Sequence, residues 1–252
     1  QEAYAAFDTG VKALSKKQTD KALSSARAAI KAFPQEAHFH ALLGDVHFAR
    51  KKYRAALESY EHAIQRNDRY CRYYLQRGLV RKHVGDAGGA RSDLETSVAM
   101  LPTAAAHSAL GFLDMDGGRD KSAIEHFRIA ATAKSDTGQR ALRELTRLEL
   151  PDNPGPYFDI AVSRSKSGHL FVTLRNKCEL PVERVLVELT WVPPGQHSRE
   201  RAWVRFNNRL VPGGMMKQEA GIPLITDKKV AQSIQARVVK AQLVRPRPRR
   251  RR

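Results

Sequence analysis

The sequence predicts a multidomain α + β protein: an α-helical solenoid of four hairpins and a capping helix, followed by a small antiparallel β-sandwich. Three observations support this prediction. Glycine recurs every 33 or 34 residues in the first half of the chain, and a segment with three prolines follows. Beyond that segment the hydrophobic period changes from about 3.6 residues to 2, which is the change from helix to strand.

The internal repeat predicts the helical hairpins. An alanine follows each repeat glycine by twelve residues, and a small residue returns seven residues later. Side chains without bulk let the two helices of a hairpin approach to about 8–10 Å, so this spacing marks their contact. The four glycines are Gly10, Gly44, Gly78 and Gly111, and the four alanines are Ala22, Ala56, Ala90 and Ala123.

This register resembles that of the tetratricopeptide repeat, from residue 3 to about residue 136. The resemblance implies that the first helix of each repeat lines a concave groove, and that the chain is an interaction scaffold that binds a peptide or a partner protein there. The groove residues implied by the register are Tyr4, Phe7, Val11, His38, Asp45, Phe48, Arg72, Leu75, Leu79, Lys82, Phe112 and Met115.

Two interpretations of this groove stay open at this point. Phe48, Leu75, Leu79 and Phe112 come from successive repeats, so we expect them to form one continuous apolar strip. Such a strip needs a cover, because an exposed apolar patch of that size is unfavourable in water. The cover is either a partner segment or another domain of the same protein.

The end of the solenoid and the start of the second domain have their own signals. Leucine recurs at positions 142, 145 and 148 among charged residues, which predicts a final amphipathic helix. Three prolines between residues 151 and 156 then forbid a helix and favour an extended linker. We therefore predict a repeat domain over residues 1–150, a linker over 151–156, a β-sandwich over 157–244 and an Arg/Pro tail over 245–252.

Alternating apolar residues predict the strands of the second domain. The alternation covers 157–163, 169–176, 184–192, 201–207, 215–220 and 233–243, separated by Gly and Pro turns. About seven short strands in some 90 residues favour a sandwich. The layout is similar to the immunoglobulin-like modules common in bacterial envelope proteins.

One predicted strand carries Arg201, Trp203 and Arg205 at alternate positions, so the three side chains share a face. This face could bind an anionic or an aromatic surface. The alternative, which we favour at this point, is that Trp203 belongs to the core and the arginines extend to its rim.

The formal net charge of +18 is unevenly distributed. Residues 151–252 carry 20 Lys/Arg against 8 Asp/Glu. An extended basic tail binds polyanions by releasing counterions, so polyanion or nucleic-acid binding is an alternative function. Neither a basic helix nor an aromatic RNA-binding platform is evident to support it. The tail arginines are Arg245, Arg247, Arg249, Arg250, Arg251 and Arg252.

No catalytic or cofactor-binding motif occurs in the sequence. HExxH, GxSxG, GxxxxGK[ST] and GxGxxG are all absent, so we predict a protein that is not an enzyme and that uses no cofactor or metal. The two cysteines, Cys71 and Cys178, fall in different predicted domains, which excludes a disulfide within either domain. No apolar run approaches the roughly 20 residues of a membrane-spanning helix.

A repeat array, a Leu-Glu-Leu-Pro junction at residues 148–151 and a β-module together resemble the non-catalytic C-terminal half of BepA-like bacterial envelope zinc peptidases. The resemblance implies a second alternative function, the substrate-recruiting region of a peptidase whose catalytic domain lies in other sequence. It also implies a periplasmic location, with a cytoplasmic one as the alternative. The start at Gln1 without a methionine suggests a trimmed N-terminus.

Overall fold

The computed structural model describes residues 1–193 and 195–244. Its contacts divide the chain into two compact units, one from Gln1 to Ala141 and one beginning at Leu142. Each unit is described by itself below. The predicted arginine tail, residues 245–252, lies outside the described residues.

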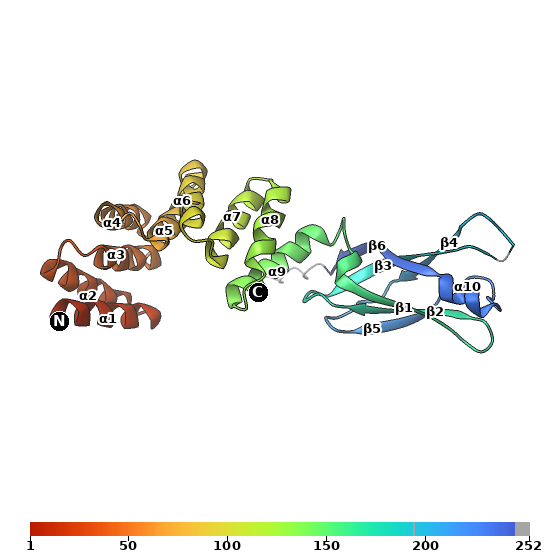
Figure 1. The fold of residues 1–252 in the computed structure, drawn as a ribbon. Coiled ribbons are helices and arrows are strands. Elements are labelled where there is room, and N and C mark those ends of the chain that lie inside the picture. The colour runs from red at the N-terminus through yellow and green to blue at the C-terminus, as the bar shows by residue number, and fades with distance from the viewer. Residues whose placement is uncertain (194, 245–252) are drawn as a thin grey trace, which may run out of the picture. The chain divides into compact units, whose positions relative to one another are not determined.

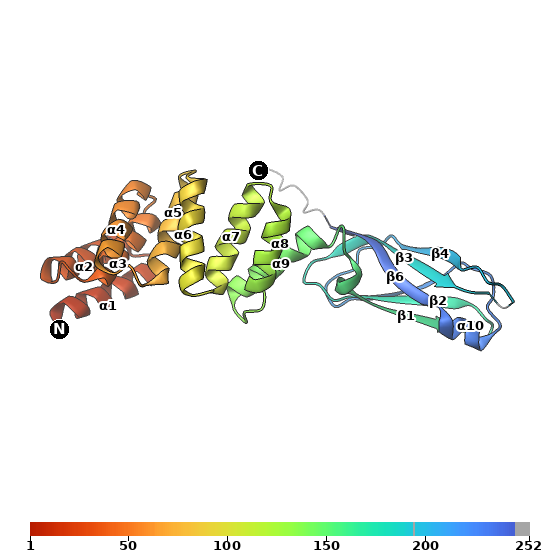
Figure 2. The same cartoon turned by 45° about the horizontal axis from the view of Figure 1, so that its top comes forward.

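The first unit consists of successive helical hairpins (Figure 1). Each odd-numbered helix packs against the helix that follows it, and each hairpin packs against the next, an order that Figure 2 shows from a second direction. The predicted solenoid is thereby confirmed. Its hairpin helices are α1 (Glu2–Ser15), α2 (Thr19–Ala32), α3 (Ala37–Ala49), α4 (Tyr53–Arg66), α5 (Cys71–His83), α6 (Ala87–Met100), α7 (Ala104–Asp116) and α8 (Asp120–Ala130).

The small residues of the repeat lie where the hairpin helices meet. The four repeat alanines are completely buried, and the four repeat glycines are buried as well. The predicted contact between Gly78 and Ala90 is present, because a Cβ added at Gly78 would lie 3.2 Å from the carbonyl oxygen of Ala90. The spacing of small residues in the sequence therefore reports the close approach of two helices.

The hairpin turns share a backbone feature that follows the repeat. Each turn has one residue in the left-handed region: Lys17 (φ 59°), Lys51 (φ 58°), Gly85 (φ 85°) and Gly118 (φ 69°). Glycine adopts this conformation without strain, whereas a lysine does so at a cost. The first two repeats therefore hold a mildly strained residue where the last two have glycine.

The last helix of the repeat region, α9 (Asp136–Glu149), does not belong to one unit alone. The division falls inside it, earlier than the predicted domain end at residue 150. Leu150 is fully buried and belongs to the hydrophobic core of the second unit. The predicted extended linker is instead a turn followed by a 3₁₀ helix, η1 (Gly155–Tyr157), and the Tyr157 hydroxyl donates to Glu149 Oε2 at 2.7 Å.

The second unit contains two three-stranded antiparallel sheets, in the orders β1-β2-β5 and β4-β3-β6. Six strands occur where the alternation predicts them, rather than about seven, and a short helix, α10 (Lys228–Ser233), is additional. The immunoglobulin-like assignment stays a prediction. The strands are β1 (Phe158–Arg164), β2 (Leu170–Asn176), β3 (Val182–Trp191), β4 (Glu200–Phe206), β5 (Met215–Glu219) and β6 (Gln235–Leu243).

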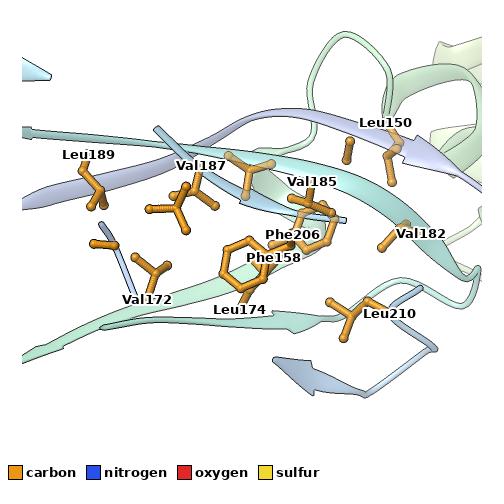
Figure 3. Packing of buried hydrophobic residues seen from close by; sticks show 14 of the residues in the cluster. Leu150, Phe158, Val172, Leu174, Val182, Val185, Val187, Leu189, Phe206 and Leu210 are labelled. Carbon is orange, nitrogen blue, oxygen red and sulfur yellow. The ribbon is translucent and has the colours of Figure 1, made fainter. Parts of the chain in front are cut away.

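The two sheets share one hydrophobic core (Figure 3). Val185, Val187 and Leu189 of β3 meet Val172 and Leu174 of β2 there, and all five side chains are almost completely buried. Because side chains alternate along a strand, the residues between them on β3 lie on the outer face of the sheet.

The prediction that Trp203 belongs to this core is wrong. Trp203 is 51% exposed, and the tryptophan in the core is Trp191, which is 8% exposed. The alternation along β4 explains the difference, because Val204 and Phe206 point inward, whereas Trp203 and Arg205 alternate with them and point outward.

Candidate functional site

The first three repeats form a concave pocket with a volume of about 300 Å³. The first helices of these repeats, α1, α3 and α5, contribute most of its wall. Five of the twelve groove residues predicted from the sequence meet here: Phe7, Val11, His38, Asp45 and Arg72. The other lining residues are Leu14, Ser15, Ala41, Leu42, Tyr70 and Tyr73.

Helix α1 supplies the apolar wall of the pocket through Phe7, Val11 and Leu14. The spacing of four and three residues places these side chains on one face of the helix. The ring of Phe7 packs against Phe39, with centroids 5.4 Å apart, and is thereby fixed. Val11 has no such support and is 43% exposed, so it is the most accessible apolar side chain of this wall.

A partly buried carboxylate, that of Asp45, forms another part of the wall. Asp45 Oδ1 accepts a hydrogen bond from the Tyr60 hydroxyl at 2.6 Å, and Asp45 Oδ2 accepts one from Arg72 Nη2 at 3.0 Å. Burial raises the pKa of Asp45 above its usual value, and these two hydrogen bonds only partly offset that effect. Arg72 keeps about half of its side chain exposed, so it can also contact a ligand.

Three rings make the third part of the wall. His38 lies 5.3 Å from Tyr70 and 5.8 Å from Tyr73 between centroids, and the two tyrosines pack edge-on at 4.9 Å. Burial raises the pKa of Tyr73. Its hydroxyl is buried without a hydrogen-bond partner in the part of the chain that the structure describes. An unpaired buried hydroxyl costs about 1–3 kcal/mol of folding stability.

The register did not identify Tyr70 and Tyr73 as pocket residues. Tyr70 is the N-cap residue of α5, and Tyr73 is buried one position beyond a predicted groove residue, Arg72. The sequence feature that could have identified them is the presence of three tyrosines within residues 70–74. These tyrosines place bulky aromatic side chains at the start of a groove helix. Aromatic residues at such a position are typical of peptide-binding surfaces.

Tyr4 and Phe48 are predicted groove residues that lie outside this pocket. Tyr4 is half exposed, and its hydroxyl donates to Glu36 Oε2 at 2.9 Å. Phe48 packs against Tyr53 and His83, with centroids 6.0 and 5.2 Å apart. Both rings are held by neighbours within their own unit.

The groove residues of the third and fourth repeats are also covered by their own unit. Leu75 and Leu79 are partly buried against the core that contains Leu110 and Leu113, and Met115 is partly buried. The residues of the predicted apolar strip from Phe48 to Phe112 are thus partly buried, and a continuous binding strip stays a prediction. The most exposed apolar side chain of the pocket lining is Val11.

Two cations cover Phe112 in particular. The Lys82 ammonium lies 5.4 Å and the Arg140 guanidinium 4.6 Å from its ring centroid. Lys82 also forms an ion pair with Asp116 at 2.9 Å. A cation over an aromatic face is an attractive arrangement, so this end of the groove is polar and already occupied.

Neither a metal site nor a membrane-spanning helix is found in the described residues. No group of three or more His, Cys, Asp or Glu side chains in residues 1–193 and 195–244 could hold a metal ion. None of the helices in these ranges is both long and apolar enough to cross a bilayer.

Residues 7–70 match the tetratricopeptide repeat family. No curated protein matches the chain. Among solved structures, a thermophilic tetratricopeptide repeat protein from Thermus thermophilus superposes with a TM-score of 0.54 at 22% identity, covering 60% of this chain and 82% of that protein. The PilF protein of Pseudomonas aeruginosa gives a TM-score of 0.55 at 20% identity, covering 58% of this chain and 67% of PilF.

The MamA protein gives a TM-score of 0.50 at 20% identity, covering 58% of this chain and 80% of MamA. At these identities the likeness concerns the fold. The shared small-residue register, the stacked hairpins and the family match agree with one another. The helical unit of this chain therefore has a tetratricopeptide-like solenoid fold, and the family itself is matched over residues 7–70.

Proposed function

We propose that this chain is a non-enzymatic interaction scaffold whose first three repeats bind a peptide segment of a partner protein in the concave pocket. Tetratricopeptide repeats bind protein or peptide partners, and that general role fits the fold. The observation that supports the specific site is the pocket of about 300 Å³ between Val11, Asp45 and Tyr73. It combines an apolar wall with a charged pair held by hydrogen bonds.

The chemistry of the walls defines the peptide that fits. An aliphatic or aromatic side chain of the peptide would contact Phe7, Val11 and Leu14, because burying apolar surface there is favourable by about 25 cal/mol per Å². The exposed part of Arg72 would contact a carboxylate or a carbonyl at the rim.

Peptide selection followed by binding measurements tests this proposal. A randomised peptide library is selected on the whole chain, and the affinity of the selected peptide is measured by fluorescence anisotropy. Val11→Glu should lower the affinity at least about 10-fold, because it places a charge on the apolar wall. Tyr73→Phe should leave the affinity unchanged and the melting temperature equal or higher, since it removes a buried, unpaired hydroxyl that a ligand does not contact.

The matched control is Val84→Glu. Val84 is 47% exposed, close to the 43% of Val11, and it lies outside the pocket at the end of α5. The proposal requires that Val84→Glu bind the selected peptide as the parent does. Equal loss in both variants, or no loss in Val11→Glu, would place the binding site elsewhere.

The BepA-like alternative and the periplasmic location stay predictions from the resemblance. A recruiting region of a peptidase would use the same pocket to hold its substrate, so the two functions differ only in what is attached to the chain. Identification of the natural N-terminus by mass spectrometry separates them, because the peptidase function requires a catalytic domain with an HExxH helix in the same protein.

A further inference from the structure

We infer that the outer face of the sheet β4-β3-β6 binds single-stranded nucleic acid, with Trp203 as the stacking platform for a base. This inference concerns the second unit and does not depend on the proposed peptide pocket or on the tail residues. It rests on the placement of one exposed indole among basic side chains on an open sheet face.

Three cross-strand rows define this outer face. The central row runs from Trp203 through Glu188 to Arg237. One neighbouring row joins Arg205, Leu186 and Lys240, and the other joins Arg201, Thr190 and Gln235. Rows of one face are two residues apart along a strand, or about 6.6 Å. Every row therefore presents at least one cation to the same surface.

Two shallow hollows flank the row of Trp203. The first has a volume of about 340 Å³, and its lining includes Arg199, Arg201 and Arg237. The second has a volume of about 390 Å³, and its lining includes Arg184, Arg205 and Lys240. Six cations thus line the two hollows on this face.

The single acidic residue of the three rows does not cancel this charge. Glu188 is 2% exposed and forms an ion pair with Arg237 at 2.5 Å and a longer one with Arg201 at 3.9 Å. Arg199, Arg205 and Lys240 have no acidic partner in the described residues. The face is therefore strongly positive, and a polyanion is its complementary partner.

The exposed indole selects among polyanions. Trp203 is 51% exposed and has no aromatic or cation partner within residues 1–193 and 195–244. Proteins that bind single strands combine a positive surface for the backbone with aromatic side chains on which bases stack. A duplex keeps its bases stacked and offers none to an indole, whereas a single strand can place one on Trp203. An acidic peptide would use the cations and leave the indole exposed.

Tryptophan fluorescence of the whole chain reports directly on this face. The chain has two tryptophans, and Trp191 is buried in the core, so quenching by an added strand comes from Trp203. The probe is a 12-nucleotide thymidine strand, and its affinity is measured by anisotropy over a range of salt concentrations. We expect saturable quenching and an affinity that falls with salt.

Variants separate the base contact from the charge contact. Trp203→Ala should weaken binding about 10-fold without changing the salt dependence, and Trp203→Phe should retain most of the affinity. Arg201→Gln with Arg205→Gln should lower the slope of log K against log salt by about 1.4, because each lost phosphate contact removes about 0.7. Lys166→Gln with Arg175→Gln removes the same charge away from this face and should leave the slope unchanged.

Competing probes decide the class of partner. Polyphosphate carries the charge without bases, polyglutamate represents an acidic protein, and vesicles of phosphatidylglycerol represent an anionic membrane. The inference holds if the thymidine strand binds more tightly than each of these at equal charge and if Trp203→Ala removes that preference. It is overturned if any of the three binds as tightly as the strand, or if the strand leaves Trp203 fluorescence unchanged.

Discussion

The ring of Tyr60 lies directly over Gly44, so closely that a Cβ added at Gly44 would be 2.7 Å from Tyr60 Cε1. The two residues face each other across the α3–α4 hairpin, and Tyr60 is completely buried. The hydroxyl of the same ring donates a hydrogen bond to Asp45 in the pocket wall. The repeat glycine thus makes room for the aromatic side chain that fixes a site residue.

Gly44→Ala should therefore destabilise the helical unit by about 1–3 kcal/mol, because the added methyl group forces the Tyr60 ring to move. Thermal unfolding followed by far-ultraviolet circular dichroism measures the change. Gly88→Ala is the control, since Gly88 lies in α6 and a Cβ there meets no atom within 4 Å. A loss of equal size at Gly88 would show that the Tyr60 contact is not the cause.

A second prediction concerns the hairpin turns. Lys51→Gly should stabilise the helical unit by about 1 kcal/mol, because Lys51 has a φ of 58° that glycine adopts without strain. Lys52→Gly tests the same chemistry one residue later, where the φ of −86° is ordinary for any side chain. We expect that change to be neutral or destabilising. If both changes have the same effect on the free energy of unfolding, the left-handed conformation of Lys51 costs nothing measurable.

The hairpins and strands could be predicted because each follows from a short-range pattern. A glycine and an alanine twelve residues apart meet within one hairpin, so the spacing alone reports the contact between its helices. Strand alternation located all six strands in the same way. The same alternation predicts that Trp203 lies on the outer face of the sheet, because Val204 and Phe206 occupy the inward-facing positions of β4.

The accessible extent of the groove could not be predicted in this way. The register places Val11 and Phe112 at equivalent repeat positions, but Arg140, far along the sequence, lies over Phe112, whereas Val11 is 43% exposed. Such a contact depends on where a later helix packs, which no repeat position encodes. The absence of a hydrogen-bond partner for the Tyr73 hydroxyl in the described residues could likewise not be predicted from the sequence. Whether a buried hydroxyl has a partner depends on the side chains that surround it after folding.

A third prediction concerns Asn176, which is fully buried at the end of β2. Its amide nitrogen donates to the carbonyl oxygens of Leu180 and Leu210 at 2.9 and 3.2 Å, and its oxygen accepts from the Cys178 backbone N–H at 3.0 Å. Asn176→Ala removes all three hydrogen bonds and leaves the buried Cys178 N–H without its acceptor, so it should destabilise the second unit by about 2–3 kcal/mol. Arg175→Ala, at the exposed neighbouring position, should change stability by less than about 0.5 kcal/mol.

Chemical unfolding monitored by tryptophan emission follows the second unit selectively, since Trp191 and Trp203 both lie in it. The Asn176 prediction concerns the midpoint of that transition. A midpoint in Asn176→Ala equal to that of the parent would show that water or a local rearrangement replaces the lost hydrogen bonds.

The last prediction concerns pH and the fully buried Asp114 of α7. Burial alone would raise the pKa of Asp114, but hydrogen bonds from Ser122, Arg91 and Arg119 outweigh it and hold the pKa below the usual range. The Ser122 hydroxyl is 2.6 Å from Oδ2 and Arg119 Nε is 2.9 Å from Oδ1. A lowered pKa in the folded state means that Asp114 contributes stability above the unfolded-state pKa of about 3.9, and that this contribution disappears as the pH falls through the folded-state pKa.

Asp114→Asn should therefore lower the stability of the helical unit at pH 7 by about 2 kcal/mol, because the hydrogen bonds to a charged acceptor are lost. Below about pH 4 the difference from the parent should shrink, since Asp114 becomes protonated there in the unfolded state and, at a still lower pH, in the folded state. Melting temperatures from pH 3 to pH 7 measure this convergence. Asp68→Asn is the control, because Asp68 is exposed and has no ion pair in the described residues. A gap between parent and Asp114→Asn that stays constant down to pH 3 would contradict the lowered pKa, because protonation of Asp114 would then have no energetic consequence.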